Sequence, residues 1–316
     1  MIPLRYVLRR IGQALLVMWA AYTVVFVVLY LVPGDPARLM LGLDGGASAS
    51  EEQIQAIRDE YGFDDPLVVQ YWSNLSELLG GDMGDSFASG VSVGRIIGDA
   101  LPNTVSLTAL GLAFAVLIGV GVVLAAQHAP FPWLARLLAS VPAVGVSIPG
   151  FWVGLLLLQF LSFRIRIFPA AGDAGFKSLV LPALVLALPA AAVIAQIFGQ
   201  SMRATLAEPY VDTARAKGAR RSRIVYRHAF RNALLPVVAV LGTTVGTMFA
   251  NSAVAETIFA RNGLGTVMVA AVTSKDMPVV QGVVLVVAAF YALTTLAIDL
   301  VSPVIDPRAG IEARTA

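Results

Sequence analysis

Six long segments of the chain contain no Asp, Glu, Lys or Arg, and this pattern restricts the possible folds more than any other feature. A helix needs roughly 20 mostly apolar residues to cross a bilayer, and each segment is long enough. Charged residues make up only 13% of the chain, whereas about a quarter is usual in soluble proteins. The sequence therefore predicts an all-α, polytopic membrane protein with six transmembrane helices, at residues 11–32, 101–126, 137–163, 178–202, 232–255 and 277–298.

The loop charges predict how the spans are oriented. Residues 203–236, which we call the basic loop, hold eight of the 22 Lys and Arg residues, whereas residues 33–100 hold 12 of the 20 acids. Loops rich in Lys and Arg stay in the cytoplasm. We therefore expect a cytoplasmic segment at 1–10, a first span at 11–32, an external loop at 33–100 and a membrane core at 101–316. An even number of spans leaves both termini in the cytoplasm of a multi-pass membrane protein.

The external loop carries signals for two short helices. Ser50 and Gln53 have the spacing of a capping box, and Gly62 is a suitable residue to end the helix that follows. A second helix is expected from Pro66, because apolar residues follow it at helical spacing. These elements predict a small folded cap that contacts the membrane interface.

The basic loop has the pattern of a helix, a glycine turn and a second helix. Leu206, Tyr210 and Ala214 are spaced to share one helix face, Gly218 suits a left-handed turn, and Ser222 is the expected N-cap of the second helix. Small alanines around the turn allow another protein to approach closely. The arginines beside them can pair with acidic groups on that partner or with lipid phosphates.

Several kinds of site are excluded or disfavoured by composition. The chain has no cysteine and two histidines, which excludes disulfides, thiolate metal sites and histidine-rich metal sites. A phosphate-binding GxxxxGK[ST] loop is missing, so any ATP has to bind elsewhere. A net charge of +2 does not favour nucleic acid as a partner. No GxSxG motif lies within a predicted span, and neither does a pair of carboxylates or a pair of histidines. This disfavours an intramembrane hydrolase.

The order Asp212-Thr213-Ala214, with Gly218 four positions later, resembles the permease signature of bacterial ABC importers. In that signature Glu-Ala-Ala is followed by a glycine, so Asp212 keeps the charge and Thr213 replaces the first alanine. The segment TARAKG with RHAFRNALLP is similar to the form in the dipeptide, oligopeptide and nickel branch. Other motifs similar to that branch extend over nearly the whole chain: YVLRRIGQ, LVPGDPA, YGFDDPLVVQYW, GDMGDSF, LPNTVSLT, SIPGFWVGLLL and ETIFARNGLG.

This resemblance implies the fold of a type I ABC importer permease in a bacterial inner membrane. It implies a second, homologous permease subunit, two ATP-binding subunits that hold ATP and Mg, and an extracytoplasmic substrate-binding protein, with no cofactor bound by this chain. ATP would drive alternating access to a substrate such as a di- or oligopeptide, and this chain would break no covalent bond. The coupling element would comprise Asp212, Thr213, Ala214 and Gly218, with Arg215 and Lys217 as further contacts.

Polar residues in and beside the spans have two possible roles. Asn103, Ser147 and Asn251 could line a translocation path, or they could bond to a neighbouring helix. Glu256 is expected to be a solvated loop carboxylate, and Asp299 is expected to lie at the interface or to cap a helix.

Two alternatives to peptide import stay open at this point. The same machine could import nickel, an opine-like metabolite or haem. A protein of another class, an ion-coupled secondary transporter, would usually carry ionisable residues inside its spans or internal repeats. The six apolar segments contain no Asp, Glu, Lys or Arg and show no evident repeat.

Overall fold

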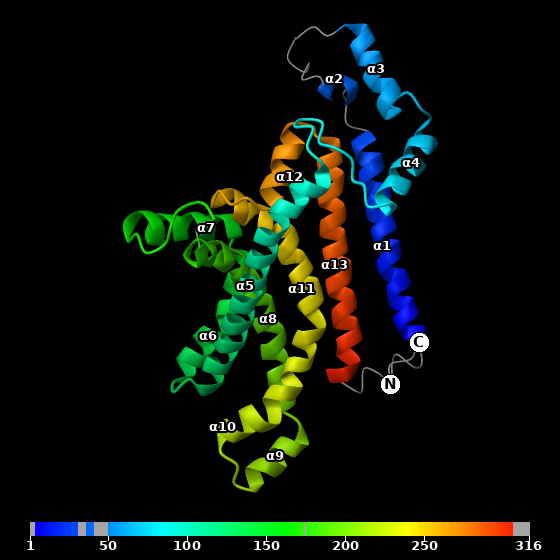
Figure 1. Cartoon of the computed structure of the whole chain (residues 1–316). Helices are drawn as coiled ribbons and strands as arrows, with labels where there is room; N and C mark the ends of the chain where they lie inside the picture. Colours follow the sequence, from blue (N-terminus) through cyan, green and yellow to red (C-terminus); the bar gives the residue numbers. More distant parts are fainter. Residues whose placement is uncertain (1–3, 31–35, 41–49, 174, 306–316) are drawn as a thin grey trace.

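The computed structural model describes residues 4–30, 36–40, 50–173 and 175–305, and the regular elements in these residues are all helices. Each of five predicted spans coincides with a long apolar helix, except that residues 31 and 32 lie outside the described residues. An all-α membrane protein is thereby confirmed. The five helices are α1 (Leu4–Tyr30), α5 (Val93–His128), α8 (Gly175–Leu206), α11 (Phe230–Ile258) and α13 (Met277–Ile305) (Figure 1).

The third predicted span, 137–163, is not one continuous helix. Helix α6 (Pro132–Ser147) is followed by α7 (Gly150–Leu157) and the π-helix η1 (Leu158–Arg164), and the chain bends by 103° between them. Ile148, at the bend, has an extended backbone (φ −89°, ψ 124°). Proline disfavours a helical conformation in the residue before it, so Pro149 accounts for the break. The third span is thus a broken one, in which two apolar helices meet at a sharp angle.

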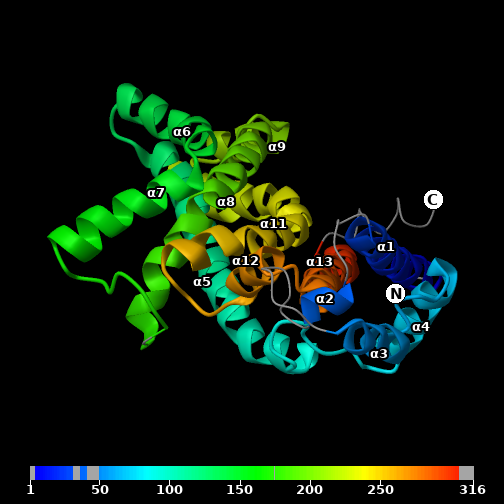
Figure 2. The ribbon, with the colours of Figure 1, turned by 90° about the horizontal axis from the view of Figure 1, so that it is seen from above.

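Helix α8 lies at the centre of the bundle, with α5 and α11 against it and α6 and α7 on the side away from α1 (Figure 2). Its residues, with those of α5 and α11, form the main hydrophobic core. The contact with α5 is close because of Gly119, where an added Cβ would lie 2.7 Å from the backbone oxygen of Ala191. A larger residue at that position would push the two helices apart.

Helix α1 packs along α13 at the edge of the bundle, as Figures 1 and 2 both show. Near their first and last turns, Arg10 forms an ion pair with Asp299 (3.0 Å), and the Tyr6 hydroxyl donates to the Asp299 backbone oxygen (3.1 Å). Asp299 therefore joins two helices by its side chain, and it does not cap one.

The predicted cap is formed by three short helices, α2 (Pro36–Met40), α3 (Glu51–Tyr61) and α4 (Leu67–Leu79). The capping box is present: the Gln53 backbone N–H donates to Ser50 Oγ, and the Ser50 N–H donates to Gln53 Oε1. Gly62 ends α3 in a left-handed conformation with φ 63°. These local predictions are confirmed. They could be made from the sequence because capping depends on residues a few positions apart.

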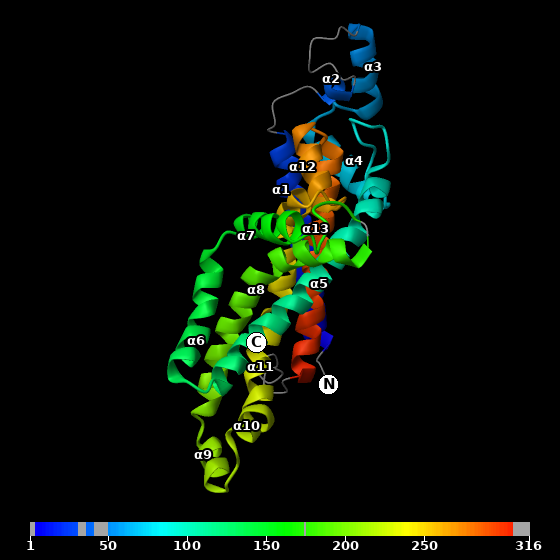
Figure 3. The same ribbon diagram turned by 90° about the vertical axis from the view of Figure 1, so that its left-hand side faces the viewer.

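The cap and the basic loop lie at opposite ends of the bundle (Figure 3). We call these the cap end and the loop end. At the cap end, the turn between α12 (Leu264–Thr273) and α13 holds the segment that leads from the cap into α5. Asp276, in that turn, accepts hydrogen bonds from the Ser86 hydroxyl and from the Phe87 backbone N–H (3.1 Å).

Candidate functional site

The basic loop extends beyond the neighbouring helices at the loop end (Figures 1 and 3). It contains α9 (Pro209–Ala216), the three-residue helix α10 (Arg221–Arg223) and the π-helix η2 (Ile224–Ala229). Helix α8 ends at Leu206, and Pro209 starts a new helix at its favoured first position. The predicted shared face of Leu206, Tyr210 and Ala214 is therefore wrong, because Leu206 belongs to a different helix.

The glycine turn is present at the predicted position. Gly218 has φ 77°, and an added Cβ there would meet no atom within 4 Å. The requirement for glycine is thus conformational, because residues with a Cβ rarely adopt positive φ. The second helix begins at Arg221, with Arg220 as its N-cap, so the prediction of Ser222 as the N-cap is wrong by two residues.

The residues predicted to contact a partner are mostly exposed on α9 and its turn. Asp212, Thr213, Arg215, Lys217 and Gly218 are exposed, and Ala214 is half-buried. Asp212 and Arg215 form an ion pair of 2.8 Å across one turn. The structure therefore presents the six residues as one short exposed element at the loop end.

Tyr210 and Val211 attach α9 to the start of α11. The Tyr210 hydroxyl donates to the His228 backbone oxygen (3.1 Å) and accepts from Asn232 Nδ2 (3.3 Å). Val211 is fully buried. The sequence pattern placed Tyr210 only on a helix face, and its hydroxyl bonds were missed because they join residues 18 and 22 positions apart.

The segment η2 connects this attachment to the hydrophobic core. Val225 and Ala229 are buried in the main core, alongside residues of α8 and α11. The Tyr226 ring stacks on His128, at the end of α5, with 5.3 Å between ring centroids. A short π-helical segment of this kind often marks a functional site. Here it joins the exposed α9 to three core helices.

Glu256 is buried at the cap end, so its prediction as a solvated loop carboxylate is wrong. Oε1 accepts from the Thr104 hydroxyl (2.6 Å), and Oε2 accepts from the Gly265 backbone N–H (2.7 Å). Thr104 Oγ1 in turn accepts from the Leu264 N–H (2.8 Å). The carboxylate thus binds the N-terminus of α12, where a helix dipole favours negative charge, and it ties together α5, α11 and α12.

Arg261 makes a second buried connection at the cap end, which the sequence did not indicate. Its guanidinium forms an ion pair with Asp173 (3.0 Å) and donates to Ser178 Oγ (3.2 Å). It also donates to the backbone oxygens of Gly172 and Ser178. The turn between α11 and α12 is thereby fixed to the segment that enters α8.

The three residues predicted to line a path make separate contacts. Asn103 donates to the Asn262 backbone oxygen (2.8 Å), and Ser147 donates to the Ala143 oxygen one turn earlier (3.1 Å). Asn251 is exposed on α11. Within the described residues no hydrogen bond joins the three side chains to each other, and their role in a path stays a prediction.

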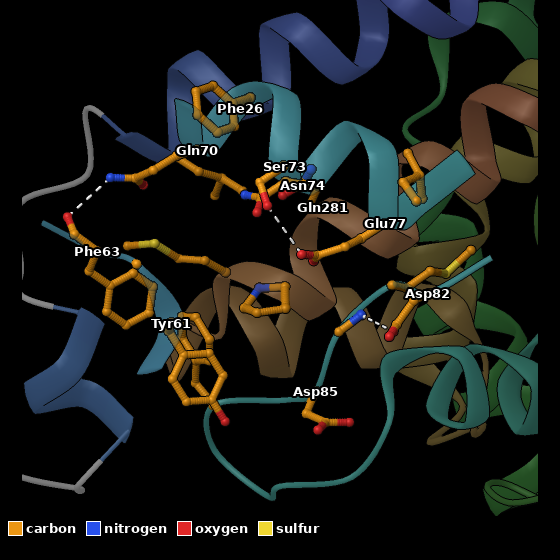
Figure 4. A pocket seen from close by; sticks show the side chains of 18 of the residues that line it. Phe26, Tyr61, Phe63, Gln70, Ser73, Asn74, Glu77, Asp82, Asp85 and Gln281 are labelled. Atoms are coloured by element: carbon orange, nitrogen blue, oxygen red, sulfur yellow. Dashed lines mark hydrogen bonds between the residues drawn. The ribbon is translucent and has the colours of Figure 1, made fainter. Parts of the chain in front are cut away.

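A cavity of about 850 Å³ lies at the cap end between α1, α3, α4 and α13 (Figure 4). Aromatic rings of Tyr61, Phe63 and Phe87 form part of its wall. Its lining also includes one arginine, Arg58, and six carboxylates: Asp59, Asp64, Asp65, Glu77, Asp82 and Asp85. Over the described part of the chain, no three His, Cys, Asp or Glu side chains gather closely enough to hold a metal ion.

Comparison with known proteins identifies relatives along nearly the whole chain. A probable peptide ABC transporter permease of Sinorhizobium fredii is 34% identical over 311 residues, which cover 96% of this chain and 98% of the relative. A putative peptide transport system permease of Brucella abortus is 35% identical over 310 residues, with the same two coverages. The glutathione transport system permease GsiC of Salmonella typhimurium is 34% identical over 304 residues, again with coverages of 96% and 98%.

The fold and two family patterns agree with these relatives. A chain in an inward-facing structure of the MetNI methionine ABC transporter superposes with a TM-score of 0.56 at 19% identity, over 67% of this chain and 96% of that one. The N-terminal family pattern for binding-protein-dependent transport membrane components matches residues 3–108. The main pattern, for the inner membrane component of such systems, matches residues 117–311. The chain therefore belongs to the family of binding-protein-dependent transport system inner membrane components, and is a multi-pass protein of the bacterial inner membrane.

Proposed function

We propose that this chain is the permease subunit through which separate ATPase subunits drive peptide import. The observation that carries the proposal is the basic loop, where α9 and the turn after it expose Asp212, Arg215 and Lys217, while Tyr210 attaches α9 to the start of α11. Charged side chains on a short exposed helix suit a protein groove, since ion pairs and hydrogen bonds fix its position there. The hydrogen bonds of Tyr210 and the buried side chain of Val211 suit transmission of force.

In this mechanism α9 moves with the ATPase subunit that holds it. ATP draws the two ATPase subunits together, and the displacement of α9 passes through the Tyr210 hydroxyl and η2 to α11. At the cap end, Glu256 and Arg261 hold α11 and α12 to α5 and to the start of α8. A bundle connected at both ends moves as a body, so the substrate site opens to one side of the membrane at a time. This chain breaks no covalent bond, and the partner subunits bind ATP and Mg.

The distribution of charge supports the orientation of the assembly. The loop end, which carries the basic loop, lies in the cytoplasm with both termini. The cap end, which carries most of the acidic residues, faces outward and receives the substrate-binding protein. A second, homologous permease lies beside this chain and completes the path, to which Asn103, Ser147 and Asn251 contribute.

A short peptide is the proposed cargo because the relatives along the full chain are named for peptide and glutathione transport. Nickel, an opine-like metabolite or haem would use the same machine with a different binding protein. An ion-coupled transporter has less support. Both oxygens of the buried Glu256 carboxylate accept hydrogen bonds within the fold, and Asp299 is paired with Arg10. Neither carboxylate is left open to a coupling ion.

Reconstitution in liposomes tests the proposal. The chain is incorporated with and without its partner permease and ATPase subunits, and uptake of a labelled peptide is measured with the binding protein outside. We expect uptake only with all subunits, ATP and the binding protein. Peptide flux through this chain alone, or uptake driven by an ion gradient without ATP, would contradict the proposal.

A further inference from the structure

We infer that helix α4 of the cap is embedded in the lipid leaflet at the cap end, with one apolar face of the helix in contact with lipid. The inference rests on the membrane location of the chain and is independent of the coupling role of the basic loop. Three observations carry it: the distribution of residues around α4, the position of α4 along α1, and the exposure of the remaining face.

The residues of α4 divide cleanly around the helix. Gln70, Ser73, Asn74 and Glu77 line the cavity at the cap end and project from α4 in Figure 4. At 100° per residue, Val68, Trp72, Leu75 and Leu79 fall on a different face, at spacings of four, three and four. We call this second set the apolar stripe. All polar and charged side chains of α4 lie outside the stripe.

Helix α4 is attached to α1 at residues that come before the C-terminal end of the apolar span of α1. The Tyr22 hydroxyl donates to the Tyr71 backbone oxygen (2.9 Å), and the hydroxyls of Thr23 and Tyr71 share a hydrogen bond (2.8 Å). Tyr71 also packs edge-on against Phe26, with 5.3 Å between centroids. The apolar span of α1 runs to Leu29. At 1.5 Å per residue, Tyr22 therefore lies about 10 Å before that end, which brings α4 to the depth of the membrane.

The apolar stripe is largely uncovered by the described part of the chain. No residue of α4 is buried, Leu75 is half-buried, and Val68, Trp72 and Leu79 are 68%, 60% and 81% exposed. Helix α1, to which α4 is attached, also exposes apolar residues, Leu15 and Trp19 among others. Both helices thus present apolar side chains outward. A tryptophan among aliphatic residues is typical of a membrane interface.

The chemistry of the stripe favours lipid over a protein partner. A binding protein that docks and leaves needs a surface that is stable in water between encounters, and such surfaces carry polar rims. The stripe has no polar member, and a helix with its backbone bonds satisfied can lie at this depth. Contact with lipid on one side and with the polar cavity on the other fits the two faces of α4.

The absence of cysteine from the sequence permits a direct test. A nitroxide spin label is attached to a single introduced cysteine in each variant. V68C, W72C and L79C place the label on the stripe, and S73C and E77C place it on the cavity face of the same helix. The complete importer, with cysteine-free partner subunits, is placed in nanodiscs of phosphatidylethanolamine and phosphatidylglycerol. Collision of each label with oxygen, which partitions into lipid, and with a water-soluble nickel chelate is then measured with and without the binding protein.

We expect the three stripe labels to collide at least five-fold more with oxygen than with the nickel chelate, with or without the binding protein. The two cavity labels should show the opposite preference. Stripe labels that are open to the nickel chelate until the binding protein is added would identify a protein docking face and overturn the inference. Stripe labels shielded from both reagents would indicate cover by the second permease and would equally overturn it. Retained peptide uptake in each variant shows that the fold is intact.

Discussion

The Tyr210 hydroxyl and the His228 backbone oxygen are joined by a hydrogen bond of 3.1 Å, which attaches the exposed helix α9 to the segment that leads into α11. The same hydroxyl accepts from Asn232. Among the described residues, the other side-chain bonds of α9 stay within that helix, and Val211 is its buried apolar residue. This hydroxyl is therefore the most specific connection between the proposed coupling element and the core.

Replacing Tyr210 by Phe removes both hydrogen bonds and keeps the ring. Both bonds are exposed and stand at the low end of the usual contribution, about 0.5 kcal/mol each and about 1 kcal/mol together. We therefore expect about five-fold less peptide import per ATP hydrolysed, with ATPase subunits still bound. Tyr226→Phe is the matched control, because its ring stacks on His128 and no hydrogen bond of its hydroxyl occurs among the described residues. Equal ratios of uptake to hydrolysis in both variants would mean that the Tyr210 hydroxyl transmits no force.

Gly218 tests the turn of the basic loop. A valine there has to adopt φ near 77°, which costs roughly 1–2 kcal/mol for a residue with a Cβ. We expect Gly218→Val to insert normally, to hydrolyse ATP and to import little. Asparagine tolerates the left-handed conformation better, so Gly218→Asn should retain most of the uptake. A valine variant as active as the asparagine variant would show that the turn geometry is unimportant.

The buried Glu256 carboxylate should stabilise the cap end. Glu256→Gln places an NH₂ group opposite a hydrogen-bond donor, and leaving a buried polar group unsatisfied costs about 1–3 kcal/mol. We expect a lower Tm for the purified importer complex, measured by intrinsic fluorescence. Glu77→Gln, at an exposed carboxylate of the cavity, should leave Tm unchanged.

A double variant shows whether Glu256 acts through Thr104. Thr104→Val alone should also lower Tm, because it removes the 2.6 Å hydrogen bond to the carboxylate. Since residues in contact couple energetically, the effects of Thr104→Val and Glu256→Gln should not add. Fully additive effects would contradict the described network.

The stability of the cap end should require arginine, and not merely a positive charge, at position 261. Lysine keeps the charge but cannot form the ion pair with Asp173 and the bonds to Ser178 at the same time. Arg261→Lys should therefore lower Tm by several degrees, whereas Arg164→Lys, at an exposed position in η1, should not. Indistinguishable melting curves would show that the connection to the start of α8 contributes little to stability.

The sequence predicted features that depend on neighbouring residues and failed where distant contacts decide. The capping box at Ser50 and the left-handed glycines, Gly62 and Gly218, follow from chemistry within one turn, and they are present. Apolar length alone indicated five of the spans. The break at Pro149 was not predicted, because prolines inside other helices, such as Pro182 in α8, leave the helix continuous. Packing of the surrounding helices decides between these outcomes.

The same contrast holds for the sites. The exposed residues of α9 were predicted from a local pattern of charge, small residues and glycine. Glu256 was misjudged because its partner Thr104 is 152 positions away, and a carboxylate at the end of an apolar run looks solvated until that partner is known. Arg261 and the Tyr210 hydroxyl were missed for the same reason.

Cross-linking from the basic loop tests the central claim most directly. Asp212→Cys is introduced into the cysteine-free chain, a photoactivatable cross-linker is attached in intact cells, and captured proteins are identified by mass spectrometry. Ser76→Cys, at an exposed position of α4, is the control at the cap end. We predict that position 212 captures a nucleotide-hydrolysing subunit and that position 76 does not. Failure of position 212 to capture any ATPase, in cells whose importer is active, would contradict the claim that a separate motor drives this chain through α9.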